Sequence, residues 1–165
     1  MKIIKSNKLI SIIIVIIILF STIFFYFIQN KKYSEEGIIK EYYNTIDETR
    51  NLKKYNSLVI SEDKLDDISV FPDIVEKREL VEIKELSPND HDDLKQIIKE
   101  KYSDSKVERK FYMVEYNIKF KKDVASPIES GNYCEVLVLE KRENKWLINT
   151  DIIKVNKDTG NIIIG

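Results

Sequence analysis

Few side chains in this chain of 165 residues have the type and surroundings needed for acid–base chemistry. His91 is the one histidine, and it stands among three aspartates at the predicted start of a helix. General acid–base catalysis needs partners that converge in space, and a histidine beside solvated carboxylates supplies none by itself. Glu115 and Asp151 lie in predicted strands, where solvent-facing or sheet-end positions explain both. We therefore predict no catalytic residue.

Metal and cofactor sites are also not indicated. Residues 61–73 are rich in carboxylates, but they lack the alternating acidic spacing, the glycine and the closing glutamate of a calcium loop. Cys134 is the one cysteine, so neither an intrachain disulfide nor a cysteine metal set can form. The sequence has no nucleophile elbow and no glycine-rich phosphate loop. We predict no metal and no cofactor.

Aromatic side chains offer the best candidates for contact with a ligand. Tyr43 belongs to a predicted helix, while Tyr116 and Trp146 belong to two predicted strands, each on an apolar face. Such side chains combine a large apolar area with a polar tip, which suits the wall of a ligand pocket. We predict these three residues as the ligand-binding set. A purely structural role in the core is the alternative.

The elements that would position these residues follow from hydrophobic periodicity. Apolar residues three and four apart predict a helix over residues 35–46, and a second, shorter helix over 52–59. Residues 80–86 form a predicted strand, and Ser87-Pro88 begins another predicted helix. From Lys110 to Ile153, three stretches with strand periodicity predict a meander, with a tight turn at Glu143–Asn144. The order is that of an α+β domain.

The N-terminal segment predicts a membrane anchor. Leu9–Ile28 contains no charge, and sixteen of its twenty residues are Leu, Ile, Val or Phe. A helix of that length spans about 30 Å, the thickness of the hydrocarbon core of a bilayer. We thus predict a single transmembrane helix within residues 1–32, with the lipid bilayer as its partner, and an α+β domain over residues 33–165.

The flanking charges set the expected orientation and exclude one class of partner. Three lysines precede the apolar segment and two follow it, which favours a cytoplasmic N-terminus and an extracytoplasmic C-terminal domain at the cell membrane. From Tyr33 onward the chain holds 22 basic and 28 acidic residues. An acidic domain repels phosphate backbones, so nucleic acid is not an expected partner.

Several short motifs resemble an uncharacterised family of bacterial cell-envelope proteins, a domain of unknown function within the nuclear-transport-factor-two-like (cystatin-like) superfamily. They are Ile39-Lys40-Glu41-Tyr42-Tyr43, Lys121-Lys122-Asp123, Ser126-Pro127, Glu129-Ser130-Gly131-Asn132-Tyr133 and Lys145-Trp146-Leu147-Ile148. The resemblance implies a cone-shaped domain in which a curved antiparallel sheet packs on helices. It places nothing specific between Ser61 and Glu108. Enzymes of that superfamily carry acid–base residues inside the cone, but fold analogy alone supplies no reaction.

The expected function is a membrane-anchored extracytoplasmic binding or assembly module without catalytic activity, with a possible protein partner in the envelope. Two alternatives stay open. One is an enzyme that acts on a small apolar substrate in the cone pocket. The other is a structural subunit of a cell-envelope complex.

Overall fold

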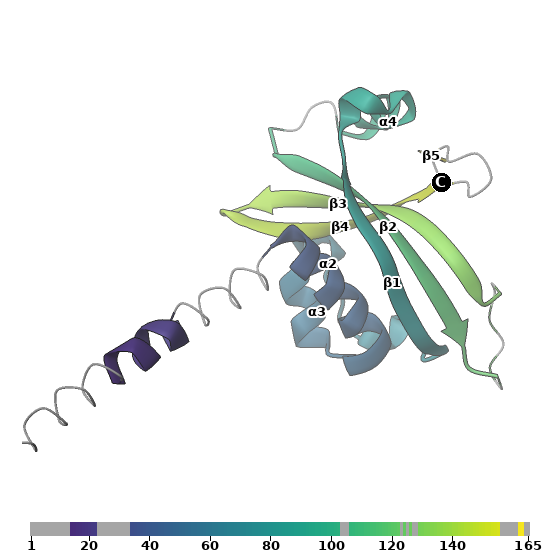
Figure 1. Cartoon of the computed structure of the whole chain (residues 1–165). Helices are drawn as coiled ribbons and strands as arrows, with labels where there is room; N and C mark the ends of the chain where they lie inside the picture. Colours follow the sequence, from purple (N-terminus) through teal and green to yellow (C-terminus); the bar gives the residue numbers. More distant parts are fainter. Residues whose placement is uncertain are drawn as a thin grey trace, which may run out of the picture. The chain divides into compact units, whose positions relative to one another are not determined.

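The computed structural model describes residues 14–22, 34–102, 106–122, 124, 126, 129–155 and 162–163. The chain divides into two compact units, residues 1–37 and residues 38–165. The first unit contains a helix over residues 14–22. The second unit contains the sheet and most of the helices (Figure 1).

The predicted transmembrane helix over Leu9–Ile28 is wrong. In the part of the chain that the structure describes, no helix is long and apolar enough to cross a membrane. Within the predicted segment, the structure describes a helix over residues 14–22. Residues 9–13 and 23–28 of the predicted segment lie outside the described residues.

Helix α2 (Glu35–Asn44) begins and ends close to where its apolar spacing predicts. The side chain of Ser34 caps it, because the Ser34 hydroxyl accepts a hydrogen bond from the Gly37 amide at 3.1 Å. A π-helical segment, Thr45–Thr49, continues the chain directly from α2. Helix α3 (Leu52–Leu58) follows and confirms the second predicted helix. π-Helical turns are rare and are often found at functional sites.

The sheet is an antiparallel meander in which every strand pairs with its neighbours in sequence. Its strands are β1 (Val75–Leu86), β2 (Arg109–Phe120), β3 (Gly131–Arg142), β4 (Lys145–Val155) and β5 (Ile162–Ile163). The three predicted strands of the C-terminal block are confirmed as β2, β3 and β4. β1 begins five residues before the predicted strand, so Arg78 lies within it.

The turn between β3 and β4 is built from two residues with left-handed backbone. Glu143 has φ of 50° and Asn144 has φ of 62°. Positive φ at both central positions is the geometry of the tight hairpin turn whose twist matches the flanking strands. The predicted reversal at Glu143–Asn144 is thereby confirmed.

β3 is buried on both of its faces. Leu137 and Leu139 pack in one apolar cluster with α2 and α3, while Val136 and Val138 pack in a second cluster with α4 (Asp92–Lys101). Side chains alternate between the faces of a strand, so the two clusters lie on opposite faces of the sheet. Figure 1 shows α2 and α3 against the sheet and α4 beside the other end of β1. β3 is therefore a central strand of the sheet, covered on both sides.

The helix predicted to open at Ser87-Pro88 begins later. Ser87 caps a short 3-10 turn, Pro88–Asp90, by accepting from the Asn89 amide at 3.3 Å. α4 then begins at Asp92, with His91 as its N-cap residue. The prediction is corrected because the capping serine and the proline start a separate tight turn, and the chain bends again before the helix.

Candidate functional site

The structure brings two of the three predicted aromatic residues together and leaves the third apart. Tyr43 of α2 and Tyr116 of β2 are both buried, and their ring centroids are 5.6 Å apart. Trp146 of β4 pairs with Lys141 of β3, whereas Tyr116 of β2 pairs with Tyr133 of β3. Tyr133 precedes Lys141 by eight residues in β3. Eight strand residues span about 26 Å. These three aromatic residues therefore do not line one pocket.

An arginine completes the group around the two tyrosines. The guanidinium carbon of Arg78, in β1, lies 4.6 Å from the Tyr43 ring centroid and 4.5 Å from that of Tyr116. Both distances are within the range of cation–π attraction. Arg78 Nε also lies 2.7 Å from Asp47 Oδ2, with side chains that are 12% and 8% exposed. This ion pair joins the π-helical segment to the edge strand of the sheet.

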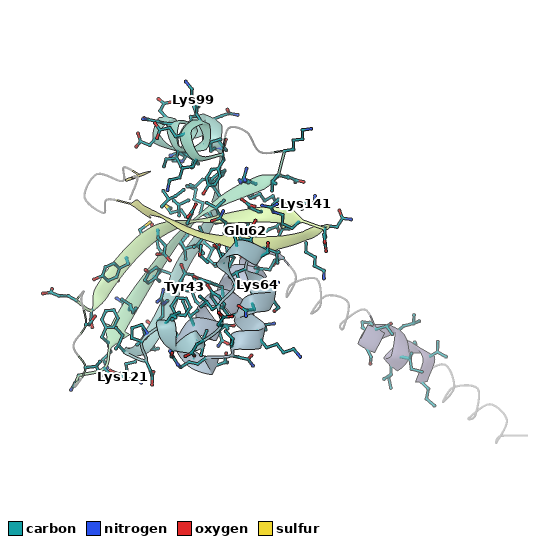
Figure 2. The ribbon with its side chains drawn as sticks, turned by 180° about the vertical axis from the view of Figure 1, so that it is seen from behind. Tyr43, Glu62, Lys64, Lys99, Lys121 and Lys141 are labelled. Carbon is teal, nitrogen blue, oxygen red and sulfur yellow. The ribbon has the colours of Figure 1, made fainter. Side chains whose placement is uncertain are left out.

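A second carboxylate holds the tyrosine hydroxyls. Glu135 of β3 accepts a short hydrogen bond from the Tyr43 hydroxyl and a second one from the Tyr116 hydroxyl at 3.4 Å. Tyr43, Asp47, Arg78, Tyr116 and Glu135 thus form one connected set, which we call the Arg78 cluster. Figure 2 marks Tyr43 between the helices and the sheet.

Two small cavities open beside the Arg78–Asp47 pair. One, of about 180 Å³, has a mainly apolar lining. The other, of about 170 Å³, is lined by Lys40, Tyr43, Asn44, Asp47, Glu48, Arg78 and Leu80. Both therefore share the ion pair as part of their wall. The lining of the first is Ile46, Asp47, Phe71, Pro72, Ile74, Val75, Arg78, Tyr116, Ile118 and Phe120.

Part of the hydrogen-bonding capacity of Arg78 is unused. Its Nη2 donates to Asp47 Oδ1 at 3.3 Å, and its Nε faces Asp47 Oδ2. Within the described residues, Nη1 has no hydrogen-bond partner. A guanidinium carries five N–H donors, so this side chain can still bind an oxyanion at its free edge.

The tyrosines of the cluster are neutral hydrogen-bond donors. Burial and the nearby Glu135 carboxylate raise the pKa of Tyr43 and of Tyr116 well above the usual range. Burial also raises the pKa of Asp47, against the lowering effect of Arg78. Each carboxylate of the cluster already has a partner, Arg78 for Asp47 and the two hydroxyls for Glu135. The arrangement suits binding better than proton transfer.

The sequence prediction missed Arg78, Asp47 and Glu135. Asp47 lies between the two helices predicted over 35–46 and 52–59, and Arg78 precedes the predicted strand. Alternation was the available signal for Arg78, because a strand extended backward from Leu80 places Arg78 on the same face. Glu135 offered a similar signal, as a charged residue two positions before Leu137 on an otherwise apolar face.

The other candidates examined in the sequence are dispersed. His91 and Asp151 are exposed and Glu115 is half-buried. In the acidic stretch, Asp63 accepts from the Thr150 amide at 2.6 Å and Asp67 accepts from the Ser69 amide at 2.9 Å. Asp63 thus joins the turn after α3 to β4, and Asp67 serves local backbone structure. Among the described residues, no group of three metal-ligating side chains is placed to hold a metal ion.

Trp146 has two cations close to its ring. The ammonium groups of Lys110 and Lys141 lie 5.3 and 5.5 Å from its ring centroid. The indole also packs, partly buried, on the apolar cluster beneath α2 and α3. This position is explained by packing and cation–π attraction. A role for Trp146 in ligand binding stays a prediction.

Comparison with known protein families assigns the chain. Residues 36–151 match the family described as Domain of unknown function (DUF4829). The match covers more than half of the chain, and the protein therefore belongs to this family. It includes α2 through most of β4 and hence the whole Arg78 cluster. No curated protein and no solved structure matches the chain significantly.

The Arg78–Asp47 pair should be stabilising, and this can be measured by unfolding. Replacing Arg78 by Met leaves the Asp47 carboxylate unpaired in a nearly buried position, which should lower the free energy of unfolding at pH 7 by about 3 kcal/mol. The folded-state pKa of Asp47 should then rise further. The difference in unfolding free energy between the wild-type chain and Arg78→Met should consequently become smaller as the pH falls through that pKa toward pH 4. Urea denaturation over this pH range measures both effects.

Two further variants control this prediction. Arg78→Met combined with Asp47→Asn removes the unpaired charge and should be more stable than Arg78→Met alone. Lys77→Met breaks an exposed pair with Glu79 and should change stability little. Equal losses for Lys77→Met and Arg78→Met would contradict the assigned role of the buried pair.

The raised pKa of Tyr43 predicts a specific loss of stability in alkali. The unfolded chain releases this phenolic proton near pH 10, whereas the folded chain retains it. The contribution is therefore fully present below pH 10 and is lost as the pH rises above it. Tyr43→Phe should flatten the decline of unfolding free energy above pH 10 by about 1.4 kcal/mol per pH unit. If unfolding free energy falls with pH equally steeply in the wild-type chain and in Tyr43→Phe, the pKa of Tyr43 is not raised by folding.

Proposed function

We propose that the domain is a non-catalytic binding module that captures a small ligand with an apolar body and an acidic end. The ligand would occupy the 180 Å³ cavity beside Arg78. The observation that carries the proposal is an arginine with a free donor edge at the wall of an apolar cavity. The apolar lining would hold the body of the ligand, and Nη1 of Arg78 would bind its oxyanion.

The size of the cavity limits the ligand. A water molecule takes about 30 Å³ of liquid volume, so 180 Å³ accommodates about six groups of that size. A phenyl ring or a short aliphatic chain fits this space. Tyr116 contributes to the cavity wall, and the ring centroid of Tyr43 lies 4.6 Å from the guanidinium carbon of Arg78. Under this proposal Tyr116 would contact the ligand directly, and Tyr43 would act on it through Arg78.

The remaining sequence interpretations are compatible with this proposal. A meander sheet covered by helices supports the proposed relationship to the nuclear-transport-factor-two-like superfamily, whose members enclose a pocket in this way. Catalysis on a small apolar substrate has less support, because both carboxylates of the cluster are engaged. No feature of the Arg78 cluster favours the other alternative, a structural subunit of an envelope complex.

Placement of the domain outside the cytoplasm of a bacterial cell stays a separate prediction. It does not depend on the identity of the ligand. Protease added to intact cells should degrade the domain, since an extracytoplasmic domain is accessible from outside. Complete protection in intact cells, with degradation after lysis, would contradict the predicted placement.

The binding proposal is tested with a matched pair of probes. Titration of the full chain with 3-phenylpropionate, followed by NMR chemical shifts, should perturb residues around the 180 Å³ cavity. The neutral 3-phenylpropanol has a similar body without the carboxylate, and should bind about tenfold more weakly because it loses a charge-assisted hydrogen bond.

Variants identify the group that recognises the carboxylate. Arg78→Lys keeps a cation beside Asp47 but removes the forked donor edge, and it should reduce the preference for the acid over the alcohol. Lys77→Met changes the adjacent exposed residue and should leave the preference unchanged. Equal affinity of the wild-type chain for the acid and the alcohol, or no binding of either, would overturn the proposal.

A further inference from the structure

A larger cleft lies apart from the two cavities beside Arg78. One of its sides is formed by the end of α3 and the turn that follows, and the other by the β3–β4 hairpin. It has a volume of about 670 Å³ and shares no lining residue with the two cavities beside Arg78. That volume is in the range of ordinary small-molecule sites. Its lining consists of Asn56, Ser57, Val59, Ser61, Lys64, Lys141, Arg142, Glu143, Lys145 and Leu147.

The charge of this cleft is opposite to that of the chain around it. Four of its lining residues are basic and one is acidic, although the chain from residue 33 onward has more acidic than basic residues. Lys64 and Lys145 are exposed, and neither forms an ion pair with another residue in the described parts of the chain. Basic charge gathered in a cleft of an acidic domain attracts anions locally.

Arg142 adds charge that its own partner does not cancel. It donates to the buried carboxylate of Glu140 through Nε at 3.0 Å and Nη2 at 2.6 Å. Arg109 also binds Glu140, with Nε 2.8 Å from Oε1. Two guanidinium groups thus share one carboxylate, which leaves a net positive charge at this end of the sheet.

The other charged groups at the cleft limit this excess but do not reverse it. Lys141 is 2.8 Å from Glu108 and is largely neutralised by it. Glu143 belongs to the lining, and Glu62 is close enough to Arg142 to interact with it electrostatically. The carboxylate of Glu62 accepts a hydrogen bond from the Ser61 hydroxyl at 2.6 Å.

We propose that this cleft binds a phosphate group. Arg142 has already committed Nε and Nη2, the edge that would pair with a planar carboxylate, to Glu140. The available donors are the ammonium groups of Lys64 and Lys145, which act as point charges and suit tetrahedral phosphate. The phosphate could belong to a soluble molecule or to a lipid headgroup.

The test measures binding of sodium tripolyphosphate to the full chain by calorimetry at low ionic strength. Lys64→Gln and Lys145→Gln should each weaken binding about threefold, and the double variant about tenfold, as expected for solvated charge contacts. Affinity should also fall as salt is added. Both lysines are exposed, so the variants should retain the unfolding midpoint of the wild-type chain.

The control removes the same two charges elsewhere. Lys99 and Lys101 belong to α4, and Figure 2 shows Lys99 well apart from Lys64 and Lys141. The double variant Lys99→Gln/Lys101→Gln should change affinity less than twofold. The same loss of affinity in both double variants would overturn the proposal. Arg78→Lys should leave tripolyphosphate binding intact, so the two binding proposals can fail independently.

A second arm of the experiment distinguishes the source of the phosphate. Vesicles of phosphatidylcholine with and without phosphatidylglycerol are sedimented with the wild-type and Lys64→Gln/Lys145→Gln proteins. Phosphatidylglycerol-dependent binding that is lost in the double variant assigns the cleft to a lipid headgroup. Tripolyphosphate binding without such vesicle binding assigns it to a soluble phosphate. Absence of both would contradict the proposal.

Discussion

Burial of β3 on both faces is the constraint on which the rest of the domain depends. Val136, Leu137, Val138 and Leu139 are all at most 1% exposed, and they alternate between two apolar clusters. A strand of this kind needs cover on each side, which α2 and α3 supply on one face and α4 on the other. Removing fully buried aliphatic side chains typically costs 2–5 kcal/mol each. The sheet therefore fixes where the helices must pack.

The Arg78 cluster is a consequence of this packing. With α2 held against the sheet, Tyr43 reaches Tyr116 and Glu135, and the π-helical segment brings Asp47 to Arg78. A polar network in a nearly buried position is stable only when its members find partners, and here each carboxylate faces one, although Asp47 Oδ2 and Arg78 Nε are not aligned as a hydrogen bond. The free edge of Arg78 is the unused capacity of that network, and the apolar cavity beside it gives the edge a plausible role in binding.

The two clefts differ in the kind of ligand that they suit. The cavity beside Arg78 is small and apolar with one cation, whereas the cleft at the β3–β4 hairpin is larger, polar and basic. Both are formed where a helix or its following turn meets the sheet. Membership in a family of unknown function does not choose between them, so their chemistry must be read from the side chains.

Local patterns in the sequence determined most of the secondary structure. Alternation along residues 110–120 placed Tyr116 on the buried face of β2, and Asn144 allowed the tight turn before β4. The same patterns predicted a transmembrane helix at the N-terminal apolar segment, and the described part of the chain contains no helix able to span a membrane. Only the tertiary structure joined Tyr43, Tyr116 and Arg78, and separated Trp146 from them. The physical reason is that periodicity reports which face a residue occupies, whereas distances between segments depend on how the elements pack.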